Sequence, residues 1–233
     1  MKTILFSFFI LFANQTNAQD STDIFVEAGH SIKDAAPISK VYRYSNFVRG
    51  KIFFRDASTS EELLNYNLLN AEVEFISPQG DTLAIIKDQA KTIKYFVIDS
   101  SIYYGSEYLE QVMENSVGKI LRRQQFLITK KDKSGSLNQS STAAIDTYSS
   151  LSDNNSGVMP YDLVARENLT LSLKTDLFFG DKFENFRRAN KKNLLKIFFK
   201  KKEAIDNYLK THEVNFNKED DLKNLLAYLQ VFQ

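Results

Sequence analysis

Apolar and polar residues alternate with a period of two through the middle of the chain, between residues 46 and 130. In AEVEFIS (71–77), Val73 and Phe75 share the face that a core would cover. Glu72 and Glu74 share the opposite face, which is expected to meet solvent. Such alternation is typical of a half-buried strand. Similar patterns predict strands at 48–55, 63–69, 71–77, 82–86, 92–98, 102–104, 108–113 and 120–129.

A tight turn, PQGD (78–81), joins two of these strands into a hairpin. Proline fixes φ at one corner, and Gly80 can take the positive φ of the other. A polar turn at 56–62 separates two earlier strands. Strands that recur about every ten residues predict an antiparallel meander, as an open sheet or a partial barrel. Ahead of it, Ile24 and Val26, and the stretch 41–44, are candidates for short strands.

The clearest alternation lies further along, at NLTLSLK (168–174), where every second residue is leucine. The segment before it, 131–160, is rich in serine, with eight between residues 134 and 156. So polar a segment can bury little apolar surface, which predicts a flexible excursion. The leucine strand is expected to rejoin the sheet beyond this excursion, followed by LFF (177–179).

From residue 190 onward the apolar residues change to helical spacing. Three helices are expected, at 190–199, at 201–211 and after Asn217, a good N-cap followed by three acids. Their apolar stripes indicate packing surfaces, and docking of a partner helix is the alternative. The predicted fold class is therefore α+β: an antiparallel β-meander followed by two to three C-terminal helices.

The first residues indicate export. Lys2 precedes a ten-residue apolar run, ILFSFFILFA (4–13), which is too short to span a bilayer. Small residues up to Ala18 predict a signal peptide at 1–18 that is cleaved before Gln19, and an uncleaved anchor is the alternative. The remaining organisation is a β-rich domain (19–130), the serine-rich segment (131–160), and final strands with helices packed on the β-domain (161–233).

Composition narrows the class of partner and compartment. The formal charge of +1 falls to zero when Lys2 is removed, so no global field favours nucleic acid. The chain has no cysteine and no tryptophan but 19 phenylalanines. An exported chain without disulfides is held by its core alone, which suits a bacterial envelope protein, in the periplasm or at the cell surface.

Residue types that carry common chemistry are scarce. Neither histidine, His30 or His212, has metal-ligand spacing, and the absence of cysteine excludes thiol nucleophiles and the usual zinc clusters. Phosphate-binding glycine motifs and the GxSxG elbow are absent. A carboxylate pair drawn from Glu72, Glu74 and Asp81 remains the enzymatic alternative. No catalytic residue, metal or cofactor is predicted.

The sharpest local feature is basic: residues 182–202 hold nine cations against one acid, Glu184. The candidate residues for binding an anionic surface are Arg187, Arg188, Lys191, Lys192, Lys196, Lys200, Lys201 and Lys202. On an exported protein the partners expected are anionic lipid or another envelope protein. The alternative is a solvated helical face whose charge the acids at 219–221 balance.

Two stretches resemble uncharacterised secreted proteins of Bacteroidota. One contains VRGKIFF, LLNYNLLNAEVEFISPQGDTLAI and TIKYFVI; the other is the tail ANKKNLLKIFFKKKEAIDNYLKTHEVNFNKEDDLKNLLAYL. The resemblance implies export, a β-rich body before a lysine-rich helical tail, and no established activity. The tail has Phe198 and Phe199 where a Phe-Pro break is expected, so the first helix is predicted to run on into the second.

Together these features favour a non-enzymatic interaction or structural role in the cell envelope. One rival is a periplasmic carrier of a lipid or other apolar ligand, with a cavity lined by Phe and Tyr. The other is a carboxylate-dependent hydrolase.

Overall fold

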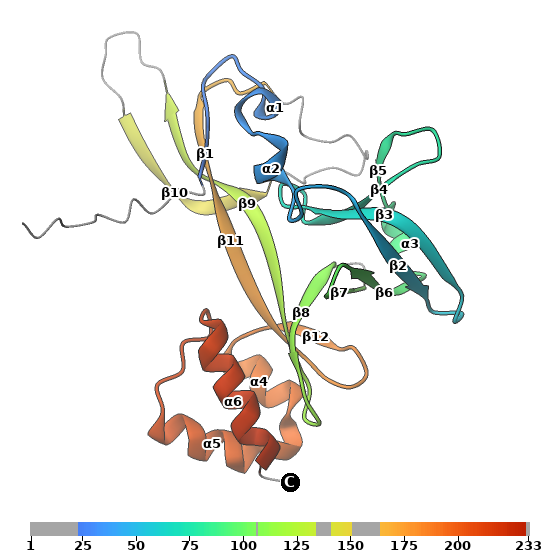
Figure 1. The fold of residues 1–233 in the computed structure, drawn as a ribbon. Coiled ribbons are helices and arrows are strands. Elements are labelled where there is room, and N and C mark those ends of the chain that lie inside the picture. The colour runs from blue at the N-terminus through green and yellow to red at the C-terminus, as the bar shows by residue number, and fades with distance from the viewer. Residues whose placement is uncertain (1–22, 106, 134–140, 151–163, 232–233) are drawn as a thin grey trace, which may run out of the picture.

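The fold is α+β, as the sequence predicts: a large antiparallel sheet is followed by C-terminal helices (Figure 1). The computed structural model describes residues 23–105, 107–133, 141–150 and 164–231. The predicted signal peptide, residues 1–18, lies outside these ranges.

The strands and helices follow in chain order. The strands are β1 (Ile24–Val26), β2 (Val48–Phe54), β3 (Thr59–Asn67), β4 (Glu72–Ile76), β5 (Thr82–Ala84), β6 (Ile93–Ile98), β7 (Ser101–Tyr104), β8 (Leu109–Glu114), β9 (Lys119–Lys133), β10 (Ser141–Ser150), β11 (Asn168–Gly180) and β12 (Phe186–Arg188). The helices are α1 (Ile32–Ala35), α2 (Ile38–Val41), α3 (Lys87–Ala90), α4 (Lys191–Ile197), the 3₁₀ helix η2 (Phe199–Lys201), α5 (Lys202–Thr211) and α6 (Glu219–Val231).

Two long strands, β9 and β11, form the axis of the molecule (Figure 1). They pair antiparallel along almost their whole length, from Asn168 opposite Asp132 to Gly180 opposite Lys119. The sheet order is β1-β11-β9-β8-β7-β6-β2-β3-β4-β5, with β10 beside β9 and β12 beside β11. The meander of β2 to β8 therefore joins this axis through a single neighbour, β8.

The axis connects two hydrophobic cores. Phe126 of β9 and Leu171 of β11 belong to the larger core, which β1, the short helices and the meander complete. At the other end, Ile120 of β9 and Phe179 of β11 enter the core of the three C-terminal helices. The leucines of α6 are buried here at 0–1% exposure, which confirms that this helix packs within the chain.

The meander curls back onto the axis. The amide of Phe126 in β9 donates to the carbonyl of Leu68, just beyond β3, at 2.8 Å. Gln125 Nε2 donates to the Leu69 carbonyl at 3.1 Å. Packed aromatic rings fill the inside of this curl, where Tyr66 and Tyr103 stack with centroids 5.2 Å apart and both are buried. The aromatic side chains inside this curl therefore belong to the hydrophobic core. A carrier would instead need a cavity at this place.

Several strands extend beyond their predicted bounds. Strand β3 begins at Thr59, inside the expected polar turn, because β2 supplies a partner for these residues: Lys51 lies opposite Glu61, and Phe53 lies opposite Thr59. Strand β11 continues through Leu177 to Gly180, since β9 supplies a partner for every residue. The hairpin of β4 and β5 is confirmed, and Gly80 has the expected positive φ of 91°.

The serine-rich segment is not wholly irregular. Within it, β10 pairs antiparallel with the far half of β9, from Ser141 opposite Lys133 to Ser150 opposite Leu127. Strand β8 pairs only with the near half of β9, so the far half offers unpaired backbone groups that even small polar residues can satisfy. Residues 134–140 and 151–160 of this segment lie outside the described residues.

The entry segment also differs from expectation. Strand β1 is confirmed and pairs with β11, but Val41 ends a short helix, α2, instead of beginning a strand. Tyr42 makes one isolated bridge to Asn67. Helix α6 begins at Glu219, two residues after the predicted cap Asn217.

The prediction that the first C-terminal helix runs on into the second is wrong. At Phe198 the backbone leaves the helical region, with φ −110° and ψ 40°, and the 3₁₀ helix η2 separates α4 from α5. The Phe198 ring is 4% exposed and packs edge-on against Phe179 at 5.7 Å. We attribute the break to the burial of this ring between the sheet and the helices.

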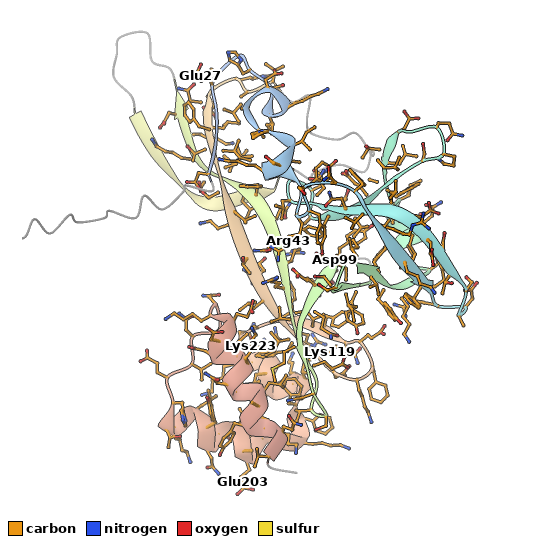
Figure 2. The ribbon with its side chains drawn as sticks, in the orientation of Figure 1. Glu27, Arg43, Asp99, Lys119, Glu203 and Lys223 are labelled. Carbon is orange, nitrogen blue, oxygen red and sulfur yellow. The ribbon has the colours of Figure 1, made fainter. Side chains whose placement is uncertain are left out.

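An ionic cluster around the buried Glu110 ties the meander to the axis and the helices. Glu110 of β8 accepts two hydrogen bonds from Arg122 of β9, at 2.7 and 2.8 Å. Arg122 also contacts Glu219 of α6 at 3.3 Å, and Arg43 lies 3.7 Å from Glu110. Figure 2 shows Arg43 near the middle of β9, between the meander and the long strands.

Candidate functional site

A groove of about 480 Å³ lies where the sheet meets the C-terminal helices. Three segments form it: the turn between β8 and β9, the loop between β11 and β12, and the junction of α4 with η2. Its lining residues are Ser116, Val117, Asp181, Lys182, Phe183, Ile197, Phe198, Phe199, Lys200 and Lys201. Five of the ten are apolar and three are lysines, so the lining combines an apolar surface with positive charge.

The β11–β12 loop is shaped by Asp181. Its Oδ1 accepts the backbone amides of Phe183 and Asn185, both at 2.9 Å, and its Oδ2 accepts the Asn185 side-chain amide at 2.8 Å. Burial alone would raise the pKa of Asp181, but these hydrogen bonds outweigh it and lower the pKa. The carboxylate is therefore engaged in holding the loop.

Two phenylalanines stand exposed at the groove, one on each side. Phe183 is 73% exposed and Phe199 is 66% exposed. A lysine ammonium lies over each ring: Lys182 Nζ is 5.0 Å from the Phe183 centroid, and Lys200 Nζ is 6.0 Å from that of Phe199. Each pair places an apolar ring and a cation at the same point of the surface.

Of the eight basic residues selected from the sequence, Lys200 and Lys201 line this groove, and the others lie in the neighbouring elements of the chain. Arg187 and Arg188 belong to β12; Lys191, Lys192 and Lys196 to α4; Lys200 and Lys201 to η2; and Lys202 begins α5. All are exposed except Lys201, which is half-buried. Arg188 pairs with Asp176 at 2.5 Å, and Lys202 pairs with Asp206 at 2.6 Å.

Half of these eight cations form no ion pair with the described residues. In the part of the chain that the structure describes, Arg187, Lys192, Lys196 and Lys200 form no ion pair. The acids of α6 do not supply one: Glu219 binds Arg122 and Lys223 instead. The geometry therefore does not favour a basic face balanced by the acidic tail.

The sequence located the cations but missed the two exposed rings. Phe183 and Phe199 occur in FEN and FFK, where nothing distinguishes an exposed ring from a buried one. Their neighbours show the difficulty, because Phe186 is half-buried and Phe198 is buried. A lysine directly adjacent in sequence is the one signal that both exposed rings share.

The hairpin acids, considered as a carboxylate pair, occupy unlike environments. Glu74 was expected on a solvent face, but it is 0% exposed, which corrects that expectation. Its carboxylate accepts Tyr42 Oη at 2.6 Å and Asn67 Nδ2 at 2.7 Å. Glu72 is half-buried and Asp81 is exposed. Among the described residues, no group of three or more His, Cys, Asp or Glu is placed to hold a metal ion.

Burial raises the pKa of Glu74, against the opposing effect of its hydrogen bonds from Tyr42 and Asn67. The folded chain thus keeps a proton that the unfolded chain releases near the ordinary pKa of 4.5. The free energy of unfolding is expected to include a contribution from Glu74 that is complete below this value. That contribution is lost as the pH rises toward the pKa in the folded chain.

Glu74→Gln keeps a neutral group in the same place and is expected to remove this pH dependence. Urea unfolding across a pH series gives the free energy of unfolding of the variant and of the wild type. The difference between the two at each pH isolates the contribution of Glu74, because the exposed carboxylates contribute equally to both proteins. Glu61→Gln, at an exposed position, is the control. Parallel stability curves for wild type and Glu74→Gln would contradict the assignment.

The chain matches no protein-family model, no curated protein and no solved structure in the comparisons made. Within the described residues, no helix is both long enough and apolar enough to cross a bilayer. The case for a function therefore depends on the geometry of the groove and the charged surface around it.

Proposed function

We propose that this chain is a non-enzymatic binding protein of the cell envelope, whose helical end attaches to an anionic lipid surface. The attachment site is the basic aromatic surface, which we define as Lys182, Phe183, Arg187, Lys191, Lys192, Lys196, Phe199 and Lys200. The observation that carries the proposal is the pair of exposed phenylalanines, each beneath a lysine.

This combination suits the boundary between lipid headgroups and acyl chains. An exposed aromatic ring gains by entering the boundary, while cations beside it meet the lipid phosphates. Each lysine or arginine close to an anionic membrane contributes about 1 kcal/mol. A partner protein would instead be expected to leave a broad apolar centre ringed by polar groups. Here each exposed ring instead has a lysine ammonium over it.

The proposal includes location. The apolar run at 4–13 and the small residues up to Ala18 support export, which would bring the basic aromatic surface to the lipids of the envelope. Attachment through a folded surface requires no membrane-spanning segment in the mature chain. A hydrolase has less support, because Glu74 is buried and is held by two neutral side chains.

Vesicle sedimentation tests the proposal directly. The chain should start at Gln19, which removes the apolar leader and keeps every described residue. We expect binding to vesicles rich in phosphatidylglycerol, weakening with added salt, and little binding to phosphatidylcholine alone. Replacing Lys191, Lys192 and Lys196 by Gln is expected to weaken binding by about 10- to 100-fold. Phe183→Ser with Phe199→Ser should also weaken it.

Matched controls lie on the meander. Leu83→Ser removes an exposed apolar side chain, and Arg49→Gln with Lys94→Gln removes exposed charge, all on strands of the meander and outside the C-terminal helices. These variants are expected to bind as the wild type does. The proposal would be overturned if these control variants lost as much vesicle binding as the variants of the basic aromatic surface. Binding to neutral vesicles without salt dependence would also overturn it. Retention of a protein partner from the envelope, without vesicle binding, would replace lipid by protein as the ligand.

A further inference from the structure

The groove beneath the basic aromatic surface has a floor that folding has already built. Phe198 is buried at 4% exposure, and the ring sits over Gly118 in the β8–β9 turn. A Cβ at Gly118 would lie 2.6 Å from Phe198 Cε1 and 2.5 Å from the carbonyl oxygen of Gly180. The floor of the groove is thus formed by backbone and by a packed ring. Its shape is therefore fixed by the fold and not by exposed side chains alone.

The walls are held as firmly as the floor. Asn115 Oδ1 accepts the amides of Val117 and Gly118, at 2.9 and 3.2 Å, which shapes the turn. The side-chain amide of Asn115 donates to the carbonyl of Leu226 in α6 at 3.0 Å, which ties the turn to the helices. On the opposite wall, Asp181 holds the β11–β12 loop through three hydrogen bonds. A preformed concave site of this size is typical of small-ligand binding.

Charge and apolar surface are separated within the groove. The apolar lining comes from Val117, Ile197 and Phe198, while Lys182 and Lys200 stand exposed at the mouth beside Phe183 and Phe199. Among the described residues, neither Lys182 nor Lys200 forms an ion pair, and the carboxylate of Asp181 is occupied by its own loop. An apolar floor below a positive rim is complementary to an apolar chain that ends in an anion.

We infer that the groove binds the single acyl chain of an anionic amphiphile, with its phosphate or carboxylate head between Lys182 and Lys200. The chain would lie against Val117, Ile197 and Phe198. This inference rests on the proposed function, because it names the part of an anionic lipid that the attachment site takes up. It makes the site a binding pocket for one molecule, whereas attachment to a surface needs only charge and exposed rings.

The absence of tryptophan gives a clean reporter for this site. Phe183→Trp places the only tryptophan of the chain at the mouth of the groove, so its fluorescence reports the groove alone. Alkyl phosphates of increasing length are titrated as monomers, below the concentration at which they aggregate. We expect a blue shift, with affinity rising by about fourfold for each added methylene until the groove is filled.

A variant that fills the groove separates pocket from surface. Ser116→Phe, added to the reporter, places a ring at an exposed wall position and is expected to weaken alkyl phosphate binding by at least about 10-fold, as expected when the acyl chain loses its site. Ser100→Phe, in the exposed turn between β6 and β7, is the matched control and should leave it unchanged. Thermal unfolding of both variants verifies that the fold is retained.

The outcomes distinguish this inference from the proposed function. Binding to anionic vesicles without binding to monomeric alkyl phosphates would overturn the pocket and leave surface attachment. Binding to the monomers but not to vesicles would support the pocket and overturn attachment to a membrane. Affinity that does not depend on chain length, or that Ser116→Phe leaves unchanged, would also overturn the pocket. Loss of all binding would overturn both.

Discussion

Phe198→Ala is expected to lower the free energy of unfolding by about 3–5 kcal/mol, while Phe199→Ala, one residue later, should change it by less than about 0.5 kcal/mol. The two side chains are identical in chemistry and adjacent in sequence. They differ in burial, with Phe198 4% exposed and Phe199 66% exposed. Each variant therefore serves as the control for the other.

The large effect follows from the position of Phe198 between two layers. Its ring packs edge-on against Phe179 of β11 and sits over Gly118, inside the core that the three helices share with the long strands. Its removal leaves a cavity that backbone on one side cannot fill, which adds to the loss of apolar burial. Urea unfolding followed by circular dichroism measures both variants.

The same pair links stability to binding. Phe199→Ala is expected to weaken binding to anionic vesicles, because its ring belongs to the basic aromatic surface. Where Phe198→Ala does not fold, Phe198→Leu should still show a clear loss of stability, smaller than that of a full truncation. Similar losses of stability at both positions would mean that the burial of these two rings is assigned wrongly.

Glu110→Ala is expected to lower the free energy of unfolding by about 3–5 kcal/mol, because it leaves the largely buried side chain of Arg122 without its principal partner. The Glu110 side chain is 9% exposed and that of Arg122 is 22% exposed. Their two hydrogen bonds, at 2.7 and 2.8 Å, hold β8 against β9 where the meander joins the axis. Of the ion pairs that Arg122 forms with described residues, the longer one to Glu219, at 3.3 Å, would remain.

An exposed pair on the meander gives the control. Glu61 and Arg49 also join neighbouring strands, but their side chains are 57% and 82% exposed and lie 3.7 Å apart. Glu61→Ala is expected to cost less than about 1 kcal/mol. The double variant Glu110→Leu with Arg122→Met should regain part of the stability that Glu110→Ala loses, since it leaves the Arg122 site without an unpaired charge. A double-mutant cycle over the two positions measures this coupling. Equal losses of stability for Glu61→Ala and Glu110→Ala would contradict the conclusion that burial makes the Glu110–Arg122 pair the stronger one.

The sequence by itself determined the elements with strong periodicity. The leucines of β11, the hairpin with Gly80 at its turn, and the apolar stripes of the helices are encoded locally, by side-chain spacing and backbone preference. The basic run at 182–202 is equally local, because charge can be counted along the chain. None of these features depends on a long-range contact.

Only the tertiary structure decided the features that depend on a distant partner. Strand β10 forms because β8 leaves one edge of the far half of β9 unpaired, while β11 occupies the other edge. Glu74 is buried because Tyr42, from the entry segment, covers it and donates a hydrogen bond. A period-two pattern places Glu74 on a face, but it does not say what will cover that face.

The candidate site divides in the same way. Its cations are visible in the sequence, but the choice of Phe198 for the core and Phe199 for the surface depends on Phe179 and Gly118, which are distant along the chain. Folding brings a turn, a loop and a helix end together to make the groove. Local spacing determines which face of an element is apolar, and packing between elements determines which apolar side chains remain exposed to bind.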